Sequence, residues 1–109
     1  MGIFTMWEFS PHVLDDTVPK GGRCIKTFVN HRDFVLSAAF TPDASWVISG
    51  SNDGSVLFLD PRTGYTQLLL QGHKSSVISV DPSPTGGFFA TCSGDMKARI
   101  WSYYALAQI

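Results

Sequence analysis

The sequence predicts an all-β fold of antiparallel strands in repeated four-stranded units, and two observations predict it. First, the chain repeats itself without a gap at an offset of 42 residues, which places His31, Ser49, Asp53 and Leu59 on His73, Thr91, Asp95 and Trp101. Second, short runs of β-branched and aromatic residues alternate with clusters of turn-forming residues. A period near 40 residues built from short strands is typical of β-propeller blades.

The strands can be placed one by one along the chain. Residues 2–9 alternate loosely and predict a strand, and residues 10–22 predict a loop because they hold two prolines and the pairs Asp15-Asp16 and Gly21-Gly22. An antiparallel meander then follows, with turn residues that supply the positive or preset φ angles hairpins need. Its expected strands cover residues 24–29, 35–40, 46–51, 56–60, 66–71, 77–80, 88–93 and 98–102. Only residues 103–109 suggest a helical period, over a very short stretch.

Composition and charge exclude several classes of protein. Eight basic and nine acidic residues leave a net charge of −1, without a basic cluster that could follow a phosphate backbone, so we expect no direct binding to nucleic acid. No apolar run approaches the roughly 20 residues that span a bilayer, and the apolar start has no basic region before it, so we expect no membrane insertion. The two cysteines, Cys24 and Cys92, predict reduced thiols, and no spacing suggests a metal site or a cofactor.

The second copy of the repeat carries a set of four polar residues. Gly72-His73, Thr91, Asp95 and Trp101 follow the order Gly-His, Ser/Thr, Asp and Trp, a pattern that resembles the WD-repeat β-propeller family. The resemblance implies a hydrogen-bonded tetrad of His73, Thr91, Asp95 and Trp101, and a triad of His31, Ser49 and Asp53 that lacks an indole because residue 59 is leucine. The first copy also has Asn30 in place of the glycine. We expect Ser49 to need another partner, at a cost of roughly 1 kcal/mol, and the first blade to be the weaker one.

The resemblance also implies how the chain is divided. Residues 1–22 would hold a remnant strand of a preceding blade and the Pro/Gly-containing loop. Residues 23–64 would form a WD repeat with a degenerate Trp-Asp, and residues 65–109 a WD repeat with the intact His/Thr/Asp/Trp set and the C-terminal end. A closed ring takes about seven blades of roughly 40–45 residues, so we expect a partial β-propeller of about two blades plus the remnant strand. We interpret the chain as a truncated paralogue, a degraded gene product or a cut piece, whose open blade edges promote self-association.

Longer stretches of sequence point to one branch of this family. Residues 31–37, 70–80 and 89–101 resemble the last two blades of the fungal Tup-type, Groucho-like general transcriptional corepressors. Departures occur at Asn52 and Gly54, where basic residues are expected, at Leu59, and at Cys92, which replaces a glycine. The resemblance implies a nuclear scaffold without a cofactor, which DNA-binding repressors recruit and which contacts other corepressor subunits. The alternative is a WD-repeat adaptor or assembly subunit outside transcription, such as a ubiquitin-ligase substrate receptor.

Two chemical alternatives have to be weighed against this interpretation. The His/Ser/Asp and His/Thr/Asp sets contain the residue types of a hydrolase triad. One active site needs one triad, however, whereas two copies at equal intervals are what a repeated architecture requires, and Ser49 lacks a nucleophile-elbow context. Asn52-Asp53-Gly54 is better explained as a tight turn than as a calcium loop, because further ligands are missing. We therefore predict no enzyme activity.

In the family that this chain resembles, partners bind the rim formed by the loops before the innermost strand and after the second strand of each blade. These loops correspond to residues 30–36, 51–54, 72–78 and 93–97. Phe34 is either a contact for a partner or packs against the neighbouring blade, and Leu36 faces either the rim or the core. Lys74, Ser75 and Ser76 are either solvated loop or partner contacts. The candidate rim residues are Arg32, Asp33, Phe34, Leu36, Asn52, Lys74, Ser75, Ser76 and Met96.

Overall fold

The structure, a computed structural model that describes residues 3–9 and 22–103, contains nine antiparallel β-strands in this part of the chain. They are β1 (Phe4–Phe9), β2 (Gly22–Phe28), β3 (Val35–Phe40), β4 (Val47–Ser51), β5 (Val56–Leu59), β6 (Thr66–Leu70), β7 (Val77–Pro82), β8 (Phe88–Ser93) and β9 (Ala98–Ser102). They confirm the predicted strands, with ends that differ by at most two residues. The predicted loop up to residue 21 and residues 104–109 of the short periodic stretch lie outside the described residues. No helix in the described part of the chain has the length and hydrophobicity to cross a membrane.

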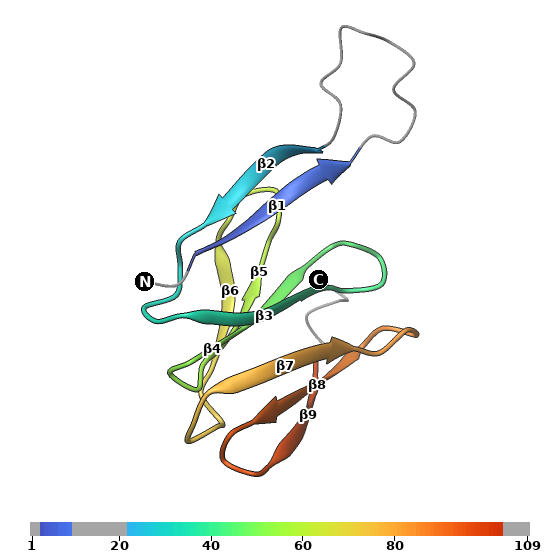
Figure 1. Cartoon of the computed structure of the whole chain (residues 1–109). Helices are drawn as coiled ribbons and strands as arrows, with labels where there is room; N and C mark the ends of the chain where they lie inside the picture. Colours follow the sequence, from blue (N-terminus) through green and yellow to red (C-terminus); the bar gives the residue numbers. More distant parts are fainter. Residues whose placement is uncertain (1–2, 10–21, 104–109) are drawn as a thin grey trace, which may run out of the picture.

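The strands form three sheets that lie one after another along the molecule (Figure 1). The first contains β1 and β2, the second runs β3-β4-β5-β6, and the third runs β7-β8-β9. The all-β blade architecture is therefore confirmed, although only the second sheet has all four strands among the described residues. The sheets are offset by one strand from the sequence repeats, because β2 pairs with β1 and β6 pairs with β5. In the first two sheets the last strand thus comes from the start of the next repeat.

Apolar side chains fill the spaces between neighbouring sheets. Ile48, Val56 and Phe58 of the second sheet are buried against Val77 and Phe89 of the third sheet and against Tyr103, which follows β9. The rings of Phe58 and Tyr103 have centroids 5.1 Å apart. On the other face of the second sheet a smaller cluster joins Val47, Leu57 and Leu59 to Phe28 of β2. The core is thus divided into two layers, because alternate residues of β4 and β5 point to opposite sides.

Candidate functional site

Four side chains of the second repeat form one continuous chain of hydrogen bonds. The Trp101 indole Nε1–H donates to Thr91 Oγ1 over 2.9 Å. Thr91 Oγ1 lies 2.7 Å from His73 Nε2, and His73 Nδ1 lies 3.0 Å from Asp95 Oδ2. Because the indole can only donate and the carboxylate can only accept, the Thr91 hydroxyl donates to Nε2 and the His73 ring donates from Nδ1. The buried hydroxyl and imidazole are therefore fully partnered.

The Asp95 carboxylate is the acceptor on which this network ends. Its Oδ2 also accepts from the Lys74 amide over 3.1 Å, and its Oδ1 accepts from the Lys97 amide over 2.9 Å. Burial raises the pKa of this carboxyl, but the hydrogen bonds from Lys74, His73 and Lys97 outweigh burial and lower the pKa to about 2. Asp95 is thus ionised at neutral pH and ties the loop before β7 to the turn between β8 and β9.

The first repeat differs from the predicted triad. His31 Nε2 lies 2.6 Å from Ser49 Oγ, and both residues are buried. Asp53, however, makes no hydrogen bond to His31; its Oδ1 accepts instead from the Ser55 amide over 2.9 Å and from the Ser55 hydroxyl over 2.6 Å. The prediction of a hydrogen-bonded His31–Ser49–Asp53 triad is therefore wrong at Asp53. Lys97 stands at the position of Ser55 in the second repeat and brings no hydroxyl that could compete for the carboxylate.

Leu59 keeps the packing expected of it but contributes no donor. It is fully buried beside Phe28, Val47 and Leu57. Within the described chain, the Ser49 hydroxyl has His31 as its hydrogen-bond partner and gains none in place of the missing indole. The network of the first repeat is therefore shorter at both ends than that of the second.

The two departures of the first repeat, Asn30 and Leu59, are related in space. In the second repeat a Cβ atom on Gly72 would lie 2.6 Å from Trp101 Cη2, so the indole needs a glycine there. In the first repeat Asn30 occupies the glycine position, and its amide donates to the Gly64 carbonyl and to Thr66 Oγ1, both over 2.9 Å. Without the indole there is room for this side chain. The sequence shows both departures, but their connection appears only in three dimensions.

The four predicted rim loops lie at the same end of the second and third sheets, toward the left in Figure 1. Within the first repeat, the Asn52 amide donates to the Phe34 carbonyl over 2.8 Å, and the Gly94 amide donates to the Ser76 carbonyl over 3.0 Å in the second. Between the repeats, Gly54 approaches His73 so closely that a Cβ atom would lie 2.7 Å from its carbonyl oxygen. The loops of both repeats therefore form one continuous surface.

The candidate rim residues divide by exposure. Phe34 is 64% exposed and Met96 is 96% exposed, so neither packs against a neighbouring sheet. Leu36 is also exposed, at a register shift in β3. Asp33 is half-buried and accepts from the Phe34 amide and from the Asn52 side chain. Two further candidates, Ser75 and Ser76, are half-buried. The remaining candidates are exposed: Arg32, Asn52 and Lys74.

Comparison with known proteins decides the family. The sequence profile described as WD domain, G-beta repeat matches residues 22–60 and 64–102, which together make up well over half of the chain. The chain belongs to the WD-repeat family. The WD-repeat chain is 73% identical over 90 residues to the transcriptional repressor rco-1 of Neurospora crassa, and 48% identical over 99 residues to the general transcriptional corepressor TUP1 of Saccharomyces cerevisiae. It is 36% identical over 74 residues to the nuclear distribution protein PAC1 of Arthroderma otae.

These matches cover most of the WD-repeat chain but little of the relatives. They include 78% of this chain and 15% of rco-1, 85% of this chain and 14% of TUP1, and 66% of this chain and 16% of PAC1. The relatedness to Tup-type repressors that the sequence suggested is confirmed for the repeat region. What the whole relatives do in their cells remains a property of much longer proteins.

The WD-repeat geometry also bears on the hydrolase alternative. Ser49 and Thr91 are completely buried, so neither hydroxyl is open to a substrate. Each bonds to its histidine in the same way at the same sequence interval, and in the first repeat Asp53 binds Ser55 instead of His31. In each repeat the histidine in the loop before the first strand of the repeat's sheet thus hydrogen-bonds to a hydroxyl in the next strand. Cys24 and Cys92 are free and exposed, and no group of three metal-ligating side chains was found among the described residues.

Proposed function

We propose that this chain is a protein-interaction scaffold of the Tup type, recruited by DNA-binding repressors and in contact with other corepressor subunits in the nucleus. The observation that carries the proposal is the 73% identity to a protein named transcriptional repressor rco-1. The 48% identity to the general transcriptional corepressor TUP1 supports it. The chain would act by binding partners at its surface, without cofactor or turnover, and without direct contact to nucleic acid.

The partner surface in this proposal is the rim of the four loops. Phe34 and Met96 supply exposed apolar side chains there, and Arg32, Asp33 and Lys74 supply charges of both signs around them. Exposed aromatic and methionine side chains within a polar surface are typical of interaction sites. Met96 adds a second argument, because it holds a φ of 69°, where a glycine is the favourable residue. A large apolar side chain kept at such a position has a use at the surface.

The proposal includes the division of the chain and the absence of catalysis. Residues 1–22, 23–64 and 65–109 are proposed as the remnant, the degenerate repeat and the intact repeat. The assignment of His31, Ser49, His73, Thr91, Asp95 and Trp101 to a structural role is tested by Ser49→Ala and Thr91→Ala. If either variant abolished an activity of the chain while its fold stayed intact, the structural assignment would be wrong.

The experiment that tests the scaffold role is co-purification with matched variants. The tagged chain is expected to enrich DNA-binding repressors from fungal nuclear extract, and Phe34→Ser is expected to reduce that enrichment. Tyr65→Ser is the control, because Tyr65 is an aromatic residue of similar exposure in the turn between β5 and β6, away from the rim.

Enrichment of ubiquitin-ligase or RNA-processing subunits instead would favour the adaptor role outside transcription. The identity to PAC1, a protein not named as a repressor, is the reason to keep that role as the second candidate.

A further inference from the structure

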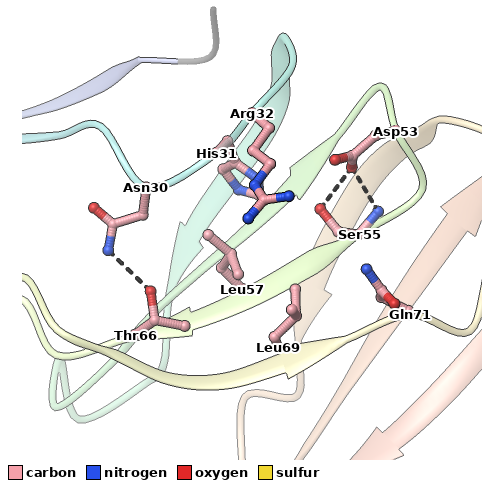
Figure 2. A pocket seen from close by; sticks show the side chains of 9 residues that line it. All are labelled: Asn30, His31, Arg32, Asp53, Ser55, Leu57, Thr66, Leu69 and Gln71. Atoms are coloured by element: carbon pink, nitrogen blue, oxygen red, sulfur yellow. Dashed lines mark hydrogen bonds between the residues drawn. The ribbon is translucent and has the colours of Figure 1, made fainter.

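A pocket of about 340 Å³ lies where the loop before β3 meets β5 and β6 (Figure 2). In Figure 2, Leu57 and Leu69 project from these neighbouring strands between Asn30 on one side and Gln71 on the other. The lining of the pocket also includes His31, Arg32 and Asp53. The volume lies within the roughly 300–1,000 Å³ of pockets that hold small groups.

His31 brings an unused polar atom into this pocket. The residue is only 4% exposed, and its Nε2 is engaged with Ser49. Its Nδ1 has no hydrogen-bond partner among the described residues. In the second repeat the same atom of His73 donates to a carboxylate oxygen of Asp95 over 3.0 Å. At His31 the hydrogen bond that Asp95 makes in the second repeat is therefore missing, because the matching aspartate, Asp53, bonds to Ser55.

Arg32, at the edge of the pocket, also lacks an anionic partner among the described residues. It is exposed, and no carboxylate of the described chain lies within ion-pair distance of its guanidinium. Asp53 also faces the pocket, but its Oδ1 is held by two hydrogen bonds from Ser55. An incoming acceptor would thus meet two nearby donors, next to the Asp53 carboxylate, which is ionised and of which only Oδ1 is engaged by Ser55. Leu57 and Leu69 offer an apolar wall next to these polar groups.

We propose that this pocket binds an acidic side chain of a partner protein, presented next to an apolar residue. The glutamate carboxylate would accept from His31 Nδ1–H and from the Arg32 guanidinium, and the apolar neighbour would pack on Leu57 and Leu69. The inference rests on the proposed function only in taking a protein segment as the occupant. The glutamate carboxylate would accept a hydrogen bond from His31 Nδ1–H, as the Asp95 carboxylate accepts one from His73 Nδ1–H in the second repeat.

The test is a nuclear magnetic resonance titration of the 109-residue chain with ¹⁵N-labelled histidine. The probes are the peptides acetyl-Leu-Glu-Leu-amide and acetyl-Leu-Gln-Leu-amide. We expect the His31 ring to carry its proton on Nδ1, and we expect its signals to shift on addition of the glutamate peptide. The glutamine peptide should bind about tenfold more weakly, because charge-assisted hydrogen bonds contribute more than neutral ones.

Two variants separate the pocket from general attraction of acidic peptides. Arg32→Gln should weaken the glutamate peptide about tenfold. Arg62→Gln should leave binding unchanged, since Arg62 is an exposed arginine that pairs with Asp60 and does not line the pocket. Equal binding of both peptides, equal effects of the two variants, an Nε2–H tautomer of His31, or no shift with millimolar peptide would each overturn the proposal. The titration needs no repressor, so it can fail while the co-purification succeeds, and the reverse.

Discussion

At the scale of single residues, the two departures of the first repeat compensate one another. Trp101 requires a glycine at residue 72, whereas Leu59 leaves space that Asn30 uses for two hydrogen bonds. A tryptophan at residue 59 would meet the side chain of Asn30, whereas Trp101 packs against Gly72, which has no side chain. Sequence comparison treats these as two independent losses, but the geometry makes them one exchange.

We therefore predict strong coupling between residues 30 and 59. Leu59→Trp should destabilise the chain because the ring clashes with Asn30, and Asn30→Gly should cost about 1–2 kcal/mol for the lost hydrogen bonds. The double variant should be more stable than the sum of the two changes by about 1–3 kcal/mol, since the indole could then reach Ser49. Urea unfolding of the four proteins measures this cycle, and additive effects would contradict it.

Met96 offers a second prediction at this scale. Its φ of 69° is a conformation that costs an L-residue roughly 1–2 kcal/mol, so Met96→Gly should stabilise the chain by about 1 kcal/mol. The same variant should reduce the enrichment of repressors, because it removes an apolar side chain of the rim. Ala44→Gly is the matched control: Ala44 has a φ of 60° in the turn between β3 and β4, away from the rim. Ala44→Gly should stabilise the chain equally and leave partner binding unchanged. If Ala44→Gly reduced binding as well, the effect of Met96→Gly would not come from a contact between the Met96 side chain and a partner.

At the scale of strands and sheets, Gly50 determines how closely the second and third sheets approach. A Cβ atom on Gly50 would lie 2.5 Å from Val77 Cγ1, which is far inside van der Waals contact. The corresponding residue of the second repeat is Cys92, which is exposed because no sheet in the described chain covers it. The glycine that the family resemblance expects at residue 92 is thus needed only where a neighbouring sheet packs that closely.

This difference predicts opposite outcomes for two substitutions at one repeat position. Gly50→Ala should destabilise the chain by about 1–3 kcal/mol, because it forces the two sheets apart. Cys92→Ala should change stability by less than about 0.5 kcal/mol, as exposed substitutions do. Denaturant midpoints at constant slope provide the measurement. If both variants behaved alike, the packing of β4 against β7 would not be what limits residue 50.

Strands could be predicted from the sequence because their signals are local. Runs such as Val35–Phe40 combine β-branched and aromatic residues between turn residues, and the structure places β3 there. Pairing could not be predicted in the same way, because nothing within Gly22–Phe28 says that it joins β1 instead of β3. The site follows the same division: residue types gave the tetrad of the second repeat, while the capture of Asp53 by Ser55 and the pocket beside His31 depend on distances between side chains.

At the scale of the whole molecule, the described residues cover one face of the third sheet and leave its other face exposed. Phe58 in β5 is completely buried because the third sheet lies over it, whereas Ile100, which occupies the same repeat position in β9, is 78% exposed. Phe88 and Cys92 are exposed beside it on the same face. Among the described strands β9 also pairs only with β8, which leaves its other edge without a partner. An apolar face next to an open edge favours association between chains.

We therefore predict that the purified chain self-associates through this face. Ile100→Lys should shift the chain toward monomer in size-exclusion chromatography with light scattering, because burial of the ammonium group on association is costly. Tyr65→Lys is the control, since it places the same charge at a residue of similar exposure in the turn between β5 and β6, away from the third sheet. The lysine at residue 100 should also leave the unfolding midpoint of the monomer nearly unchanged, because Ile100 makes little contact within its own chain. A wild-type chain that is monomeric and melts cooperatively would contradict the prediction. Equal effects of the two lysine variants would also contradict it, because the change would then come from net charge and not from the exposed face of β7–β9.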